Sequence, residues 1–121
     1  MNLIVDNNIV FYLLGGNRRI KSLLNKTTVH IPFIVEIELL SHPKIKTEEL
    51  KLIRSFINDS IRIPYSDQLK ESVIEVRKSS KIKIPDAFVA ASSLITNYTL
   101  VSADTDFRKV EDLNFIEFNL S

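Results

Sequence analysis

The chain of 121 residues has no cysteine, and it has only two histidines and two glycines. Without cysteine it can form neither a disulfide framework nor a thiolate metal site. His30 and His42 stand apart at a spacing that matches no metal-binding motif, so we interpret both as structural. The sequence also lacks a glycine-rich phosphate-binding loop. Any chemistry must therefore come from other side chains, and the carboxylates are the main candidates.

A strong net charge and long apolar segments are also missing. The formal net charge is +1, so the total does not indicate a strongly basic surface, although local basic patches remain possible. No apolar run approaches the ~18 residues of a membrane span, and the first residues do not resemble a signal peptide. We expect a soluble cytoplasmic protein that does not associate with a membrane. Residues 1–121, which are 45% hydrophobic, fit one domain with a single core.

Short apolar runs alternate with helical patterns along the chain. Strands are expected at residues 3–5, 29–31, 61–63, 99–101 and 114–118, and helices at 8–14, 18–24, 33–40, 47–57, 67–78 and 86–96. The last strand alternates more than the others, which favours a sheet edge. Such alternation predicts an α/β fold, a three-layer α/β/α sandwich with a mostly parallel central sheet.

Several residues predict where these helices begin and end. Gly15 and Gly16 should close the first helix in the left-handed conformation. Thr47 and Ser66 should supply capping oxygens to the helices that follow them. Asp86 directly follows Pro85, whose fixed backbone suits a first helical turn, and should lie at a helix N-terminus.

Four acids fall at the boundaries of these elements. Asp6 and Asp104 follow strands, Asp86 begins a helix, and Glu38 lies in the helix after the second strand. Functional sites in parallel sheets form outside the carboxyl ends of the strands, so these acids are expected to converge there. Glu36 points about 200° away from Glu38 on a helix, and periodicity alone does not choose between them. Taken singly, each acid also has a purely structural interpretation, with Asp6 and Asp86 as helix caps, Glu38 as a surface residue and Asp104 as a turn former.

Converging carboxylates need a counter-charge. Two of them about 5 Å apart repel by roughly 3 kcal/mol at an effective dielectric constant of 20, so a cation or a proton must offset the repulsion. Oxygen ligands without cysteine or histidine favour Mg²⁺ or Mn²⁺. A hydrated metal held by acids can activate water and stabilise charge on a phosphodiester, so nuclease chemistry is the natural prediction.

Four segments of the chain resemble the motifs of PIN-domain ribonucleases. They are Leu3–Asn8, Glu38–Leu40, Pro85–Ala91 and Leu100–Phe107, in the same order and spanning almost the whole chain. The length is similar to that of VapC-type toxins, which are small members of that family. The resemblance implies a PIN-like fold, cleavage of RNA that depends on Mg²⁺ or Mn²⁺, a homodimer, and a cognate antitoxin protein as partner.

The resemblance also implies roles for individual residues. It assigns catalysis to Asp6, Glu38, Asp86 and Asp104, and it assigns metal binding to Asp6, Asp86 and Asp104. Glu38 is preferred over Glu36 because Leu39 and Leu40 follow it as in the family. Supporting roles fall to Asn8, Ser102 and Asp106. Two departures stand out, because Asn7 replaces a common Thr or Ser and Ala103 replaces a more polar residue.

Several basic residues are candidates for binding RNA. Contacts to RNA phosphates are expected from Arg77, Lys78, Lys81 and Lys83, or from Arg18 and Arg19, unless these residues form only a solvated charged face.

An inactive PIN-like module that binds RNA or protein is one alternative to the ribonuclease. A receiver-type phosphoacceptor domain is another, but it requires an Asp at the end of the third strand, where this chain has Pro64.

Overall fold

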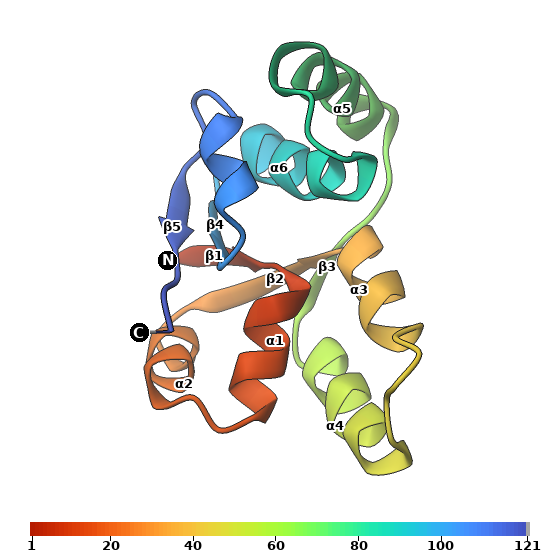
Figure 1. The fold of residues 1–121 in the computed structure, drawn as a ribbon, viewed down its shortest axis with the longest axis vertical. Helices are drawn as coiled ribbons and strands as arrows, with labels where there is room; N and C mark the ends of the chain where they lie inside the picture. The colour runs from red at the N-terminus through yellow and green to blue at the C-terminus, as the bar shows by residue number, and fades with distance from the viewer. Residues whose placement is uncertain (121) are drawn as a thin grey trace.

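All strands of the central sheet run parallel (Figure 1). The computed structural model describes residues 1–120, so Ser121, the last residue of the expected domain, lies outside the described residues. The strands are β1 (Asn2–Val5), β2 (Thr28–Pro32), β3 (Ile61–Ile63), β4 (Thr99–Ser102) and β5 (Phe115–Glu117). Their order across the sheet is β3-β2-β1-β4-β5. Each strand lies where the sequence predicted one, and β5 is at an edge as expected.

Helices connect the strands. They are α1 (Asn7–Leu14), α2 (Arg18–Asn25), α3 (Phe33–Leu40), α4 (Thr47–Asn58), α5 (Asp67–Ser80), α6 (Ile84–Thr96) and the short 3₁₀-helix η1 (Thr105–Lys109). The sequence predicted α1 to α6. It did not predict η1, because five residues are too few to show a helical period.

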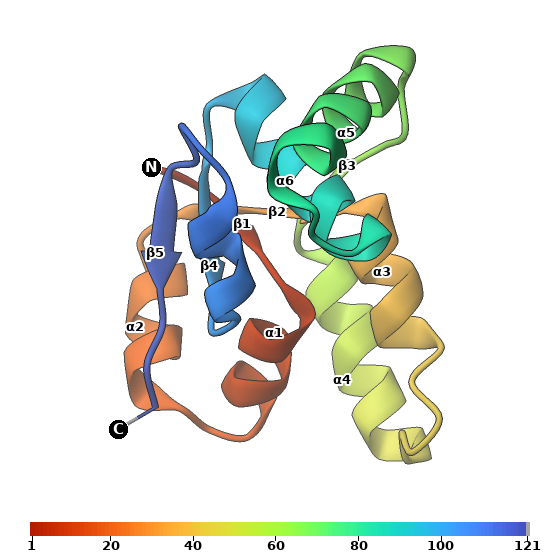
Figure 2. The ribbon, with the colours of Figure 1, turned by 45° about the horizontal axis from the view of Figure 1, so that its top comes forward.

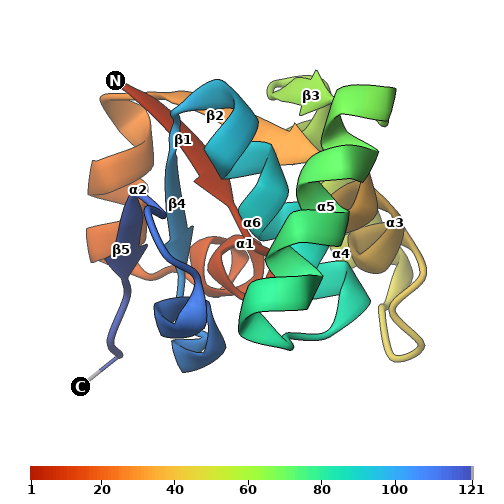
Figure 3. The same cartoon turned by 90° about the horizontal axis from the view of Figure 1, so that it is seen from above.

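The helices cover both faces of the sheet. In Figure 1 the sheet crosses the middle of the molecule, with α5, α6 and η1 above it and α1, α2 and α4 below it. Figure 2 shows α3 beside α4, and Figure 3 shows α5 beside α6. The predicted three-layer α/β/α sandwich is confirmed. Among residues 1–120, no helix combines the length and the apolar character needed to cross a membrane.

The central strands are apolar because helices cover both of their faces. Leu3, Ile4 and Val5 of β1 and Leu100 and Val101 of β4 are fully buried. Strands of parallel sheets read as continuous apolar runs for this reason. Leu3 pairs with Thr99 and Val5 with Val101, so β1 and β4 end side by side. The residues that follow these two strands are therefore brought together at one edge of the sheet.

Helix α6 begins two residues earlier than expected. It starts at Ile84, with Pro85 in the first turn and Asp86 as the third helical residue. Proline is tolerated there because its missing N–H would have no partner within the helix. Asp86 still lies in the first turn, as predicted, but it does not cap the helix. Ala87, Ala90 and Ala91 are fully buried and pack α6 into the core.

The predicted caps differ in their outcome. Ser66 caps α5 as expected, since its hydroxyl accepts a hydrogen bond from the Leu69 N–H at 3.0 Å. The prediction for Thr47 was wrong, because α4 begins at Thr47 itself and the capping position is Lys46, whose side chain makes no capping bond. Gly15 follows α1 with φ of −78°, and only Gly16, at φ of +91°, adopts the left-handed conformation.

Candidate metal centre

Asp6 directly follows β1, and hydrogen bonds hold both of its carboxylate oxygens. The Asn7 N–H donates to Oδ1 at 2.9 Å, and the Ser102 hydroxyl donates to Oδ2 at 2.8 Å. The Asn8 amide nitrogen donates to the same Oδ2 at 3.4 Å. Asp6 is only 4% exposed, and Ser102 is fully buried. The position and direction of the Asp6 carboxylate are therefore fixed by the protein itself.

Ser102, at the end of β4, connects Asp6 with Asp104. Its hydroxyl oxygen accepts a hydrogen bond from the Asp104 N–H at 3.1 Å and one from the Asn8 side chain at 3.3 Å. The Asn8 side-chain oxygen in turn accepts from the Ala103 N–H at 3.2 Å. These bonds join the segment that leaves β1 to the segment that leaves β4. Asn8 and Ser102, both expected to support the site, lie at its centre.

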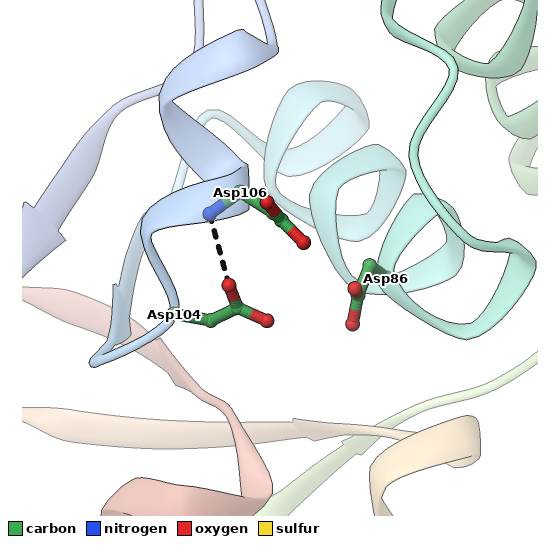
Figure 4. Close-up of side chains that lie close together, drawn as sticks. All are labelled: Asp86, Asp104 and Asp106. Atoms are coloured by element: carbon green, nitrogen blue, oxygen red, sulfur yellow. Dashed lines mark hydrogen bonds between the residues drawn. The ribbon is translucent and has the colours of Figure 1, made fainter.

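Asp86, Asp104 and Asp106 bring their carboxylates together between α6 and η1 (Figure 4). One oxygen from each of the three lies within 4.8 Å of the others. Asp104 caps η1, since its Oδ1 accepts a hydrogen bond from the Asp106 N–H at 2.9 Å. Figure 4 shows Asp106 reaching from η1 toward Asp86 on α6. We call these three residues the acid cluster.

Glu38 and Glu36 both belong to α3, but their side chains lie in different environments. Glu36 accepts a hydrogen bond from Arg62 Nε at 2.7 Å and forms an ion pair with it, away from the other acids. Glu38 is half-buried, and its pKa is raised by burial and then by the nearby carboxylates of Asp6 and Asp86. The structure therefore groups Glu38, rather than Glu36, with the other acids.

Burial and mutual repulsion raise the pKa of the central acids. The pKa of Asp86 rises to about 6, first because of burial and then because of the charges on Asp104, Asp6 and Asp106, while Lys83 opposes the rise. Burial also raises the pKa of Asp6, with a contribution from Asp104, although hydrogen bonds from Ser102 and Asn7 act in the other direction. Burial is the largest cause of each shift, and repulsion between neighbouring carboxylates adds to it.

The acid cluster has donors and spacing suited to a divalent ion. Its donors are carboxylate oxygens, which hard cations such as Mg²⁺ and Mn²⁺ prefer. Metal–oxygen distances of about 2.1 Å place two oxygens of one octahedral ion roughly 3 to 4 Å apart. Oxygens within 4.8 Å of one another need only small side-chain movements to reach that geometry. The residues therefore fit a Mg²⁺ or Mn²⁺ site, to which Asp6 and Glu38 add negative charge.

The predicted phosphate-contacting residues have different surroundings. Arg19 donates to the Asn119 carbonyl at 2.7 Å and lies 4.7 Å from the centre of the Phe118 ring. Arg77 donates to the Ile82 carbonyl at 2.7 Å. The exposed side chains also include Arg18, Lys78, Lys81 and Lys83. Of the six, Lys83 is the one whose charge acts on Asp86.

Sequence reasoning missed Lys109. Its ammonium nitrogen lies 3.3 Å from Asp106 Oδ1, so a cation directly contacts the acid cluster. The local signal for this contact is the three-residue spacing of Asp106 and Lys109, which aligns the two side chains only if a helix forms there, and η1 is the one described helix that was not predicted.

His30 is structural, as predicted. It is 5% exposed, its Nε2 lies 2.9 Å from Asn2 Oδ1, and its ring packs on Tyr98 with centroids 4.4 Å apart. Burial lowers the pKa of His30. His42 is exposed and contacts the edge of Phe11 with centroids 5.2 Å apart. Both histidines make contacts away from the acid cluster.

The sequence model of the PIN domain matches residues 3–113, which is most of the chain. The chain belongs to the PIN-domain family. The resemblance seen in the sequence motifs is thereby confirmed, and the receiver-type alternative is excluded. PIN domains are generally nucleases, and the acid cluster of this PIN domain agrees with that chemistry. A search of curated proteins gives no match.

Solved structures share the fold of this PIN domain. VapBC2 from Rickettsia felis, bound to a DNA fragment from its promoter, matches with a TM-score of 0.87 and 21% identity, over 98% of this chain and 100% of that one. A toxin–antitoxin complex from Klebsiella pneumoniae matches with a TM-score of 0.81 and 23% identity, over 94% and 95%. DNA-bound VapBC from Salmonella typhimurium matches with a TM-score of 0.85 and 16% identity, over 97% and 98%. At these identities the likeness establishes the fold.

Proposed function

We propose that this PIN domain is an endoribonuclease that depends on Mg²⁺ or Mn²⁺ and is the toxin of a toxin–antitoxin pair. The observation that carries the proposal is the convergence of three carboxylates within 4.8 Å at the carboxyl edge of the sheet. Family membership supports nuclease chemistry. The toxin role is supported by the full-length fold match to structures from toxin–antitoxin systems.

The proposed chemistry divides the acids by position. The three carboxylates of the acid cluster would hold the metal. Asp6, which the sequence predicted as a metal ligand, is not among these three residues and adds negative charge next to Asp86. A divalent ion held there would supply charge that polarises a phosphate oxygen and lowers the pKa of a bound water. Glu38 orients the attacking water and accepts its proton. The raised pKa of Glu38, caused by burial and then by Asp6 and Asp86, suits a general base.

At the two departures from the family pattern, the observed contacts to the site are made by the backbone. At Asn7 the contact to Asp6 is made by the backbone N–H, and at Ala103 the contact to Asn8 is also made by the backbone N–H. Any residue other than proline supplies such a donor. The alternative of an inactive binding module was based on these two positions, so the active nuclease is the better supported proposal.

The proposal also includes protein partners. We propose a homodimer and a cognate antitoxin. Self-association is supported by an apolar hollow of about 360 Å³ on α5 and α6, where Ile74 and Ile84 are 40% and 53% exposed. Both isoleucines line this hollow, so they offer apolar surface to a second protein. The compartment implied by an RNA substrate and an antitoxin is the cytoplasm.

Incubation with total RNA tests the chemistry. The parent protein should cut RNA with Mn²⁺ or Mg²⁺ and should leave it intact with EDTA. Asp86→Asn should be inactive, because it removes a charged ligand of the acid cluster. Asp112→Asn, an exposed acid with φ of 63°, is the matched control and should retain activity, since asparagine tolerates that backbone conformation as well as aspartate does. RNA cleavage that is equal in all three proteins, or that survives EDTA, would contradict the proposal.

A further inference from the structure

Lys109 lies on the same side of η1 as the acid cluster. A 3₁₀-helix has three residues per turn, so the side chains of Asp106 and Lys109 are aligned. The distance of 3.3 Å between Lys109 Nζ and Asp106 Oδ1 agrees with this geometry. The preceding residue, Arg108, turns toward β5 and pairs with Glu117. Arg108 and Lys109, two adjacent cations of one short helix, therefore have separate environments, and only Lys109 contacts the acid cluster.

Lys83 is the corresponding cation on the other side of the cluster. It is the N-cap residue of α6, three positions before Asp86, and its side chain is exposed. Burial and neighbouring carboxylates raise the pKa of Asp86, and the Lys83 ammonium opposes that rise. Figure 4 shows Asp86 on α6 facing Asp106 on η1. The two lysines thus belong to the two elements that face each other across the acid cluster.

The charge of the site makes these cations important for a polyanion. Asp6, Glu38 and the acid cluster together carry five carboxylates. One divalent ion neutralises only part of that charge, so an approaching phosphate chain is still repelled unless nearby cations attract it. The exposed ammonium groups of Lys83 and Lys109 lie where such attraction is needed. Arg77 and Arg19 instead donate to the backbone carbonyls of Ile82 and Asn119.

We propose that Lys83 and Lys109 bind the RNA phosphates on either side of the bond that is cut, so that the strand crosses the acid cluster from α6 to η1. This inference rests on the proposed function, since it concerns the substrate of the same site. It makes Lys109 a substrate-binding residue as well as the ion-pair partner of Asp106. Because the contacts are to phosphates, they contribute affinity and position without selecting a base sequence.

Binding of a fluorescein-labelled single-stranded RNA oligonucleotide tests the inference. Fluorescence anisotropy is measured at several salt concentrations with Mg²⁺, in an Asp86→Asn background that does not cut the RNA. Lys109→Gln and Lys83→Gln should each weaken binding roughly 3- to 10-fold near 0.1 M salt, and each should reduce the slope of log K against log salt by about 0.7. Lys109→Arg keeps the charge and should restore binding.

Arg108→Gln is the matched control, because Arg108 is a cation of the same helix that pairs with Glu117 and does not contact the acid cluster. Its RNA affinity and salt slope should equal those of the background protein. With Asp86 intact, Lys109→Gln should raise KM for RNA cleavage more than it lowers kcat. Equal RNA binding by Lys109→Gln and Arg108→Gln would overturn the inference while leaving the nuclease proposal in place. A parent protein that neither binds nor cuts RNA would overturn both.

Discussion

The Ser102 hydroxyl donates a hydrogen bond of 2.8 Å to Asp6 Oδ2, although the two residues are 96 positions apart in the chain. The same oxygen accepts the N–H of Asp104 at 3.1 Å. One buried side chain thus sets the distance between the acid that follows β1 and the acid that follows β4. The relationship depends on β1 and β4 being neighbours in the sheet, which no local sequence pattern specifies.

Ser102→Ala should lower both stability and metal affinity. Removing the hydroxyl takes one of its hydrogen bonds from the Asp6 carboxylate and leaves the Asp104 N–H without its partner, which should reduce the free energy of unfolding by about 1 to 3 kcal/mol. Urea denaturation measures that loss, and calorimetric titration with Mn²⁺ measures the affinity.

Ser92→Ala provides the comparison for Ser102→Ala. Ser92 is also fully buried, but its hydroxyl donates only to the Phe88 carbonyl within α6. This variant should lose some stability and should bind Mn²⁺ like the parent. If the two variants bound Mn²⁺ equally well, Ser102 would have no role in positioning the acids.

Asp86→Asn should lose metal-induced stabilisation without losing the fold. In EDTA its melting temperature should equal or exceed that of the parent, because removing one charge relieves the repulsion among the acids. Addition of Mg²⁺ at about ten times its dissociation constant should stabilise the parent by about 1.4 kcal/mol and the variant much less. Thermal melts with and without Mg²⁺ measure both effects. A large loss of stability in EDTA would instead mean that Asp86 is needed for the fold.

The metal-free protein should gain stability on mild acidification. The pKa of Asp86 is raised to about 6 by burial and by the charges on Asp104, Asp6 and Asp106. Between the unfolded pKa near 4 and the folded pKa near 6, the native state binds the proton more tightly, so stability is lost as pH rises through this window. From pH 7 to pH 5 the parent should gain roughly 1 kcal/mol relative to Asp86→Asn, after allowance for solvent screening.

Urea denaturation in EDTA at pH 5, 6 and 7 measures this difference. Burial and nearby carboxylates also raise the pKa of Glu38, so Glu38 also makes the folded state more stable as the pH falls. Burial lowers the pKa of His30, so acidification below about 6.5 acts against the fold through that residue. Subtracting the variant from the parent removes the His30 contribution and the part of the Glu38 contribution that comes from burial and Asp6, while the part that comes from Asp86 belongs to the measured difference. Parallel pH profiles would show that Asp86 titrates normally in the folded protein.

Glu38→Gln and Glu36→Gln form a matched pair of changes on one helix. Loss of a general base typically costs 10²- to 10⁴-fold in rate, so Glu38→Gln should lower kcat for RNA cleavage by at least about 100-fold. Glu36→Gln should change kcat little and cost at most about 1 kcal/mol of stability, because its ion pair with Arg62 is exposed. Single-turnover cleavage and urea denaturation are the measurements. Equal rates for the two variants would remove Glu38 from the proposed mechanism.

The sequence by itself determined the elements and the kind of site. Apolar runs such as Leu3–Val5 are buried in a parallel sheet, so their local composition already indicates strands covered on both faces. Asp6 and Asp104 follow strands, and a parallel sheet brings the ends of its strands to one edge. These inferences needed only local periodicity and one general rule of topology. The choice of Glu38 over Glu36 needed the family resemblance as well, because both glutamates have similar apolar neighbours.

Only the tertiary structure decided how the side chains meet. It placed Asp106 with Asp86 and Asp104 in the acid cluster, because the five residues of η1 turn back toward α6. It paired Lys109 with Asp106 but Arg108 with Glu117, and it brought Arg19 to the Asn119 carbonyl. These outcomes depend on contacts between segments far apart in sequence and on a helix too short to leave a periodic signal. Local patterns determine the elements, whereas distances between side chains depend on how the elements pack.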